Sequence, residues 1–279
     1  MAELISGKTA RLNPLVRRIL APNAGPFTGP GTNTYLVGNK YVAVIDPGPA
    51  IEKHIDAIVD EAGEAIRWIL VTHTHVDHSP AALLLKERLP QDVELIGMPS
   101  NAEGFSHDGD FEPDVLFVHD QQLSTEEFSL TALHTPGHAS NHLCFYLESQ
   151  RLLFSGDHIM EGSTVVIAPP DGNMLNYLAS LELLQNYDLA AIAPAHGHVI
   201  DNPHEIVAHT ISHRLARESK VVLGLQSNPG VDLPALTAVV YDDVPVFMHP
   251  AAQQSLLAHL LKLKHEAAVV EEQGAWTLL

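Results

Sequence analysis

The chain has 279 residues, 46% of them hydrophobic, and its 34 acidic residues outnumber 15 lysines and arginines to give a net charge of −19. This length and apolar content can bury the core of one catalytic domain and a small appendage, which excludes a disordered chain. An acidic surface repels polyanions at long range, and no basic stripe interleaved with aromatic residues indicates a nucleic-acid track.

Hydrophobic patterning predicts strands and helices in irregular alternation over the first 225 residues. The predicted strands are Val16–Leu20, Thr34–Val37, Tyr41–Ile45, Arg67–Thr72, Glu94–Ile96, Val115–Val118, Ser129–Leu133, Leu143–Leu147 and Leu152–Phe154. The predicted helices are Glu52–Glu61, Ala81–Arg88, Leu175–Leu184 and His204–Leu223. Neither an internal repeat nor a low-complexity stretch interrupts them.

The end of the chain predicts a small second domain. Gln226–Gly230 has the composition of a linker, Leu233–Tyr241 and Ala251–Lys264 predict helices, and Val269–Leu278 predicts a hairpin. This order is the outline of a winged helix. We therefore divide the chain into a catalytic domain, residues 1–225, and a winged-helix-like domain, residues 226–279.

A DNA-reading winged helix would need a basic second helix. Here that helix offers only Lys262 and Lys264, beside His259 and His265, in a strongly acidic chain. We expect no DNA partner and favour a lid or an oligomer contact, so a homodimer is one expectation for the assembly.

Cysteine content and hydropathy bear on the compartment. The single cysteine, Cys144, excludes an internal disulfide framework, which is typical of a reducing compartment. No run approaches the ~20 apolar residues of a membrane span, and the first residues lack the hydrophobic core of a secretory signal. We expect a cytoplasmic protein without a membrane partner.

The segment from His73 to His78 places three imidazoles and one carboxylate within six consecutive residues. Neutral imidazole is the commonest protein ligand for zinc, and a carboxylate beside it adds negative charge and a proton acceptor. If the chain stays extended here, His73, His75 and Asp77 alternate to one side while His78 turns away. One short segment could then serve two neighbouring metal positions.

The cluster lies between a predicted strand and a predicted helix. Ser79 and Pro80 after it predict a helix cap and a first-turn proline. Three later residues follow other predicted strand ends or apolar runs, where a rigid sheet can aim a side chain. They are His138 after a Pro-Gly turn, Asp157 in Ser-Gly-Asp, and His196 in Pro-Ala-His-Gly-His. Buried without a metal, such polar groups would cost about 1–3 kcal/mol each, so a metal site is favoured.

These motifs resemble those of the metallo-β-lactamase superfamily. Within it the chain is similar to glyoxalase II and, more closely, to the β-lactamase-like protein 2 group. The closer likeness is carried by Gly31–Gly38, by His213-Arg214-X-X-Arg217-Glu218 and by the winged-helix outline. The five ordered superfamily motifs match Asp46 at a strand end, His73-X-His75-X-Asp77-His78, His138, Asp157 and His196. The resemblance implies an αβ/βα sandwich of two mixed sheets with helices outside and the metals at one edge.

The resemblance also implies two divalent metal ions and a ligand set. The implied ligands are His73, His75 and His138 for the first ion, Asp77, His78 and His196 for the second, and Asp157 as the bridge. Histidine and aspartate without cysteine suit Zn²⁺, our first choice, and also Fe or Mn. The diiron oxygen-reducing branch has a glutamate where this chain has His75, which favours hydrolysis over redox chemistry.

The expected reaction follows from two neighbouring ions. Ions about 3.5–4 Å apart can share a hydroxide and lower the pKa of water from about 15.7 towards about 7. We expect Asp77 to orient this hydroxide and to accept its proton. A serine or cysteine nucleophile is not favoured, because Ser155 lies outside a Gly-X-Ser-X-Gly motif and Cys144 has no motif. The expected function is hydrolysis of an ester, thioester or lactone of a small molecule.

Two other functions stay open. The first is a single-strand endoribonuclease like the β-lactamase-like protein 2 group, which would need Arg214, Arg217 or Lys220 to flank the metals. RNA would then be the partner in place of a small molecule, although the charge of the chain does not favour it. The second is a non-catalytic, metal-containing winged-helix binder.

Three residues are predicted substrate contacts: Asn33 and Asn141, which are amides near strand ends, and His158, which adjoins the implied bridge. The chain departs from the superfamily at His158, where a small residue or cysteine is expected, and at Pro80-Ala81, where glycines are frequent. These departures concern the pocket wall and the helix start rather than metal binding.

Overall fold

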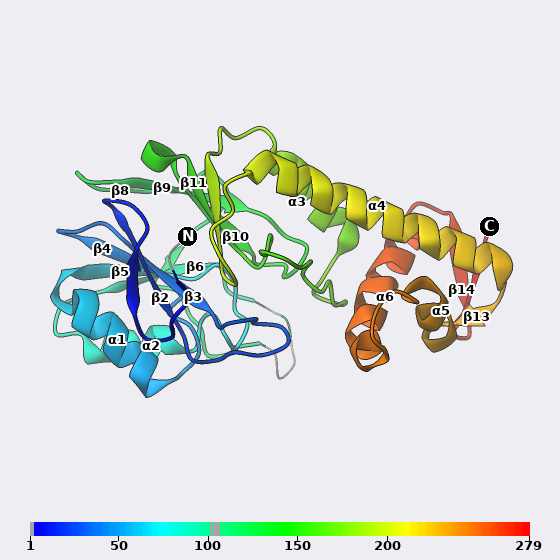
Figure 1. The fold of residues 1–279 in the computed structure, drawn as a ribbon, viewed down its shortest axis with the longest axis horizontal. Helices are drawn as coiled ribbons and strands as arrows, with labels where there is room; N and C mark the ends of the chain where they lie inside the picture. The colour runs from blue at the N-terminus through cyan, green and yellow to red at the C-terminus, as the bar shows by residue number, and fades with distance from the viewer. Residues whose placement is uncertain (1–2, 101, 103–106) are drawn as a thin grey trace. The chain divides into compact units, whose positions relative to one another are not determined.

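The computed structural model describes residues 3–100, 102 and 107–279 (Figure 1). The chain forms two compact units that are interleaved in sequence. The first unit comprises Met1–Thr135, Asn141–Thr164 and Asp188–Pro203, and the second comprises Pro136–Ser140, Val165–Tyr187 and His204–Leu279. The domain boundary after residue 225 stays a prediction.

Two mixed sheets form the first unit, as predicted. The seven-stranded sheet has the order β1-β2-β3-β4-β5-β6-β7, antiparallel from β1 to β4 and parallel from β4 to β7. The five-stranded sheet has the order β12-β11-β10-β9-β8, with only β11 and β12 parallel. The strands are β1 Thr9–Arg11, β2 Val16–Leu20, β3 Asn33–Val37, β4 Val42–Ile45, β5 Ile66–Leu70, β6 Glu94–Gly97, β7 Val115–Leu116, β8 Gln122–Ser124, β9 Ser129–His134, β10 Leu143–Leu147, β11 Leu152–Gly156 and β12 Ala191–Pro194.

Side chains that alternate along each strand separate two cores. In β3, Tyr35 and Val37 pack with Leu143 and Phe145 of β10, so this core lies between the two sheets. Leu36, between them in sequence, joins the core on the opposite face of the first sheet. Both faces of β3 are therefore covered, which is why the consecutive residues Tyr35, Leu36 and Val37 are all buried.

Helices α1 (Glu52–Ala62) and α2 (Ala81–Arg88) cover the outer face of the first sheet, as Figure 1 shows. Ile55 and Ile58 of α1 and Leu85 of α2 enter the core on this face. The spacing of Ile55 and Ile58 places both on one face of α1. The mixed α/β class and the helices outside this sheet are thus confirmed.

The second unit contains four helices and a small antiparallel sheet. Buried Leu236 of α5, Leu256 and Leu260 of α6 and Trp276 of β15 share its core. The predicted winged-helix outline is confirmed, although α4 extends into the predicted linker and ends at Ser227. The elements are α3 Met174–Leu184, α4 Pro203–Ser227, β13 Val231–Asp232, α5 Leu233–Val240, α6 His249–His265, β14 Val269–Glu272 and β15 Ala275–Leu278.

The sequence missed only short strands that pair at sheet edges. Each missed strand lies at the outer edge of its sheet, and two to four residues carry too little pattern to be recognised. These strands are Thr9–Arg11, Gln122–Ser124, Ala191–Pro194 and Val231–Asp232. Across residues 3–100, 102 and 107–279, no helix combines the length and the apolar character needed to cross a membrane.

A buried histidine on α1 predicts how stability changes with pH. His54 is 1% exposed, its Nε2 lies 2.7 Å from Thr34 Oγ1, and burial lowers its pKa from 6.5 to about 4. The unfolded chain takes up a proton below pH 6.5, whereas the folded chain does so only near pH 4. Stability is therefore complete above pH 6.5, and about 3 kcal/mol of it is lost as the pH falls to 4.

Urea unfolding of His54→Gln at pH 7 and pH 4.5 tests this expectation. The variant should lose less unfolding free energy than the wild type between these pH values. His204→Gln, a substitution at an exposed position, is the control and should behave like the wild type. An unchanged loss in His54→Gln would contradict the expectation.

Candidate metal centre

The loop after β5 begins extended and then turns. The backbone N–H groups of His78 and Ser79 both donate to the His75 carbonyl, at 2.9 and 3.3 Å. The expectation of an extended chain through Asp77 was therefore wrong beyond His75. The turn arises because β5 ends at Leu70 and the chain must reverse to begin α2 at residue 81.

The predicted cap of α2 was also wrong. Pro80 precedes the helix in helical conformation, and no side chain caps the first turn. The hydroxyl of Ser79 instead donates to Asp108 at 2.6 Å. A carboxylate across the loop thus outcompetes the neighbouring backbone for this hydroxyl.

Two carboxylates and two imidazoles meet beside this loop. His196 Nε2 lies 3.2 Å from Asp157 Oδ1 and 3.3 Å from Asp77 Oδ2. His78 Nε2 lies 3.5 Å from the same two oxygens. The ligand atoms of Asp77, His78 and His196 all lie within 4.8 Å of one another, as do those of His73, His78 and Asp157. Asp157 therefore lies where the two groups meet.

Each imidazole of this group is oriented through its other nitrogen. His78 Nδ1 donates to Asp46 Oδ2 at 2.9 Å, and His196 Nδ1 donates to the Gly31 carbonyl at 3.1 Å. Asp46 is itself held by the backbone N–H of Thr72 at 2.7 Å and its hydroxyl at 2.8 Å. In both rings the Nε2 lone pair is left for a ligand, the usual arrangement of histidines that bind metals.

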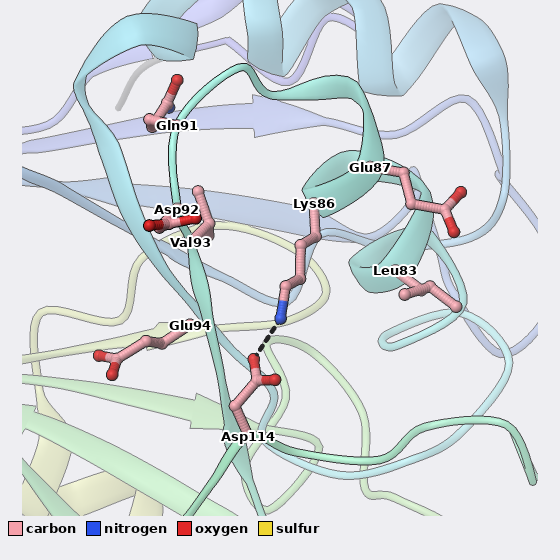
Figure 2. A pocket seen from close by; sticks show the side chains of 8 residues that line it. All are labelled: Leu83, Lys86, Glu87, Gln91, Asp92, Val93, Glu94 and Asp114. Atoms are coloured by element: carbon pink, nitrogen blue, oxygen red, sulfur yellow. Dashed lines mark hydrogen bonds and ion pairs between the residues drawn. The ribbon is translucent and has the colours of Figure 1, made fainter.

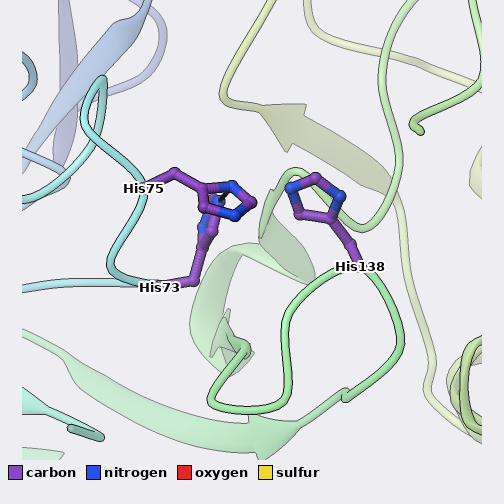
Figure 3. Close-up of side chains that lie close together, drawn as sticks. All are labelled: His73, His75 and His138. Atoms are coloured by element: carbon purple, nitrogen blue, oxygen red, sulfur yellow. Dashed lines mark hydrogen bonds between the residues drawn. The ribbon is translucent and has the colours of Figure 1, made fainter. Parts of the chain in front are cut away.

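His73 and His75 turn ring nitrogens toward each other, as Figure 3 shows. His73 Nε2 and His75 Nδ1 are 2.8 Å apart. His73 Nδ1 lies 3.0 Å from Thr72 Oγ1. Because this hydroxyl donates to Asp46, His73 Nδ1 must donate to the hydroxyl, which leaves its Nε2 as the ligand atom.

His138, the third imidazole labelled in Figure 3, belongs to the second unit. It lies on the 136–140 loop, half-buried, and its Nδ1 donates to the Val166 carbonyl at 2.8 Å. Its Nε2 is therefore the ring nitrogen that would coordinate a metal, together with the ligand atoms of His73 and His75 within 4.8 Å.

Burial and charge oppose each other in this cluster. Burial works to lower the pKa of His196, but the carboxylates of Asp157 and Asp77 outweigh it and raise the pKa to about 10. Burial likewise opposes a charge on His78, yet Asp77, Asp157 and Asp46 raise its pKa well above 6.5. Negative charge is thus concentrated at a buried point, as a site for a cation requires.

The donor set fits a divalent cation. His78 Nε2 is buried and has no hydrogen-bond partner among the described residues, although it faces two carboxylates. Imidazole nitrogen and carboxylate oxygen are both ligands for zinc, and an ion between them would satisfy this nitrogen. These residues form a His/Asp metal-binding cluster.

Sequence reasoning missed His142, a fully buried imidazole behind the cluster. Its Nε2 accepts from the backbone N–H of Asp157 at 3.2 Å, and its Nδ1 lies 2.9 Å from Thr135 Oγ1. Its ring centroid is 5.1 Å from that of His73. Its position directly before β10 was the available signal, since the ligand candidates also lie at strand ends.

The three predicted substrate contacts are all buried. Asn33 donates from Nδ2 to the carbonyls of Pro194 and Gly197, both at 2.9 Å, and so braces the loop that carries His196. Asn141 donates to Thr74 Oγ1 at 3.1 Å and to the Met98 carbonyl at 2.9 Å. The ring of His158 lies 5.9 Å from that of His142. Their contact with substrate stays a prediction.

The three basic side chains that the ribonuclease alternative requires form ion pairs or hydrogen bonds within the second unit. Arg217 forms an ion pair with Asp243 at 2.8 Å, and Lys220 forms one with Asp242 at 2.9 Å. Arg214 is 3% exposed and donates to the Val165 carbonyl. Arg217 and Lys220 are therefore paired with carboxylates, and burial shields Arg214 from a phosphate backbone.

A pocket of about 510 Å³ in the first unit contains none of the predicted site residues. Figure 2 shows that its lysine, Lys86, is paired with Asp114, at 2.5 Å. The pocket is lined by Leu83, Lys86, Glu87, Gln91, Asp92, Val93, Glu94 and Asp114. It offers mixed charges rather than convergent ligands, so it is not the metal centre.

Cys144 is excluded as a nucleophile on physical grounds as well as by motif. It is fully buried on β10, and burial raises the pKa of its thiol to about 12. The reactive thiolate is therefore absent at neutral pH.

Comparisons with known proteins agree with this geometry. Residues 27–196 match the metallo-beta-lactamase superfamily, and residues 233–276 match the beta-lactamase associated winged helix domain. A beta-lactamase-like protein 2 homolog from Caenorhabditis elegans is 31% identical over 93% of this chain and 87% of its own length. An atrochrysone carboxyl ACP thioesterase from Aspergillus chevalieri is 32% identical over 94% of this chain and 85% of its own length.

A beta-lactamase domain protein from Burkholderia ambifaria has the same fold. Its crystal structure matches with a TM-score of 0.82 and 20% identity, covering 98% of this chain and 94% of that one. The resemblance to the β-lactamase-like protein 2 group is confirmed by the relatives of that name. The chain therefore belongs to the metallo-beta-lactamase superfamily and carries its hydrolase fold.

Proposed function

We propose that this protein is a dinuclear metal-dependent hydrolase that cleaves an ester, thioester or lactone bond of a small molecule. The observation that carries the proposal is the convergence of Asp77, His78, Asp157 and His196 within hydrogen-bonding or ion-pairing reach at a buried point. Such a donor set has no evident role in stability without a cation, because it concentrates buried charge.

The proposed ligands follow the superfamily pattern. His73, His75 and His138 would hold the first ion, and the second would be held by Asp77, His78 and His196, with Asp157 shared. Zinc is the proposed metal because the set consists only of imidazole and carboxylate. Bound there, two divalent ions would polarise the bond to be cleaved and make water a nucleophile near neutral pH.

Asp77 is the proposed general base because of its exposure. Its carboxylate is 23% exposed, whereas that of Asp157 is 11% exposed. A water that enters the site can therefore reach Asp77, which orients it toward the carbonyl carbon and takes its proton. The oxygen of water adds to that carbon, the C–O or C–S bond then breaks, and Asp77 returns the proton to the departing oxygen or sulfur. The products are an acid and an alcohol or thiol.

A thioester is supported as the substrate class by a relative that is similar over most of this chain. The relative from Aspergillus chevalieri is named for thioester cleavage on a carrier protein, which is acyl transfer to water. For this chain we propose the same bond class, with a small molecule as the partner and no RNA. The net charge of −19 and the internal pairing of Arg217 and Lys220 support the exclusion of a polyanion.

Metal analysis and a hydrolysis screen test the proposal. Mass spectrometry of the purified chain should find about two zinc ions, and a panel of thioesters, esters and lactones should contain the preferred substrate. Removal of metal by a chelator should abolish turnover, and zinc should restore it. Cleavage of short single-stranded RNA without turnover of any acyl substrate would contradict the proposal. So would a failure to bind metal after reconstitution with zinc or manganese.

A further inference from the structure

The 136–140 loop that carries His138 is built against α3. Gly137 has φ +143°, and a Cβ there would lie 2.4–2.6 Å from the Cα, Cβ and N atoms of Tyr177. The Gly137 carbonyl accepts from the backbone N–H of Asn173 at 2.7 Å, and the Pro136 carbonyl accepts from Ser180 Oγ at 2.8 Å. Contacts with α3 therefore fix the backbone of the loop, independently of the hydrogen bond that orients its imidazole.

The orientation of the imidazole comes from residues 165–167, which we call the strap. The Val166 carbonyl accepts the proton of His138 Nδ1 at 2.8 Å. This bond selects the tautomer that leaves Nε2 for a metal, and it sets the rotation of the ring. The placement of the Val166 carbonyl thus sets the placement of His138.

Two helices of the second unit, α4 and α6, hold the strap on either side of Val166. The Val165 carbonyl accepts from the guanidinium of Arg214 on α4. The backbone N–H of Ile167 donates to Ser255 Oγ on α6 at 3.2 Å. The residue before Val166 is thus hydrogen-bonded to α4, and the residue after it is hydrogen-bonded to α6.

Both ties are sheltered from water. Arg214 is 3% exposed, with its guanidinium 5.1 Å from the centre of the Tyr177 ring, and Ser255 is 5% exposed. Water cannot replace a lost partner at such positions without reorganisation of the strap. Arg214, which the ribonuclease alternative would need beside the metals, is instead part of the support of the strap.

We propose that Arg214 and Ser255 are positioning residues for the metal ligand His138, and that the helices of the second unit thereby set the affinity for one of the two metal ions. The inference rests on the proposed function, since it requires His138 to be a ligand. It gives the winged-helix region a role in this enzyme without a nucleic-acid partner. Partners that orient metal ligands change affinity by about 10–100-fold when they are removed.

Zinc titration of the full-length, metal-free protein against a chromophoric chelator tests the inference. Ser255→Ala should weaken the binding of one of the two ions about tenfold and leave the other unchanged. Ser255→Thr keeps the hydroxyl and should restore the affinity. Arg214→Gln should weaken the binding of the same ion. His138→Ala identifies this ion, because that variant should no longer bind it.

Thr237→Val is the matched control. Thr237 is 1% exposed in the same unit, and its hydroxyl donates only to Leu233 within α5, at 2.7 Å. Thermal unfolding of both metal-free variants measures the cost to folding. Loss of affinity in Ser255→Ala and not in Thr237→Val supports the inference, whereas equal losses in both would overturn it.

Two failures remain distinguishable. A wild type that binds two ions, with Ser255→Ala and Arg214→Gln binding them equally well, overturns the positioning role and leaves the proposed function intact. A wild type that binds no metal overturns the proposed function itself.

Discussion

Alanine at position 77 is expected to lower kcat/KM for the preferred acyl substrate by about 10²–10⁴-fold, the usual contribution of a general base. Asp77 Oδ2 lies 3.3 Å from His196 Nε2 and 3.5 Å from His78 Nε2, so the carboxylate is placed to act on a water held in the same group. Steady-state kinetics on the best substrate of the screen measure the effect. The kcat/KM of Asp77→Asn should fall by a similar factor, since an amide cannot accept the proton.

Asp60→Ala is the control for a lost carboxylate, because Asp60 is exposed on α1. It should retain wild-type kinetics. Metal analysis of Asp77→Ala separates loss of the base from loss of an ion, since turnover abolished with both ions retained assigns the effect to proton transfer, whereas turnover abolished with one ion lost assigns it to the metal site. Full activity in Asp77→Ala would refute the proposed mechanism and favour the alternative in which the fold is used only for binding.

The location of the metal centre could be predicted because its signals are local. The His73–His78 segment follows an apolar strand, and His196 and Asp157 each follow another. Strand ends at one edge of a sheet bring distant residues together whatever the lengths of the connecting loops. Sequence alone therefore identified residues that the fold of the first unit brings together.

The supports of these residues could not be predicted, because each depends on tertiary contact. Nothing near Asp46 in sequence indicates that it accepts from Thr72 and His78. The bond between His142 and the backbone of Asp157 spans fifteen positions of the chain. The spacing of three residues between Arg214 and Arg217 places both on one side of a helix, but it does not indicate whether water or protein covers that side.

Alanine at position 156 is expected to destabilise the fold by about 3–5 kcal/mol, the sum of backbone strain and overlap with packed neighbours. Gly156 ends β11 with φ +50°, a conformation that L residues rarely adopt. A Cβ there would lie 2.6 Å from His142 Nε2 and 2.7 Å from Thr72 Oγ1. Both neighbours are tied to the metal centre, since His142 binds the backbone of Asp157 and Thr72 binds Asp46. Urea unfolding of Gly156→Ala measures the loss of stability, and metal analysis measures the loss of metal affinity.

Gly162→Ala separates backbone strain from crowding. Gly162 has φ +76°, so alanine is strained there too, but no atom lies within 4 Å of its would-be Cβ. We expect this control to lose about 1 kcal/mol, the cost of a positive φ alone, and to keep its metal. Because the neighbours of Gly156 support Asp46 and Asp157, Gly156→Ala should lose metal affinity together with stability. An equal, small loss in both variants would mean that His142 and Thr72 can move aside, and the close packing behind the metal ligands would then have no part in holding them.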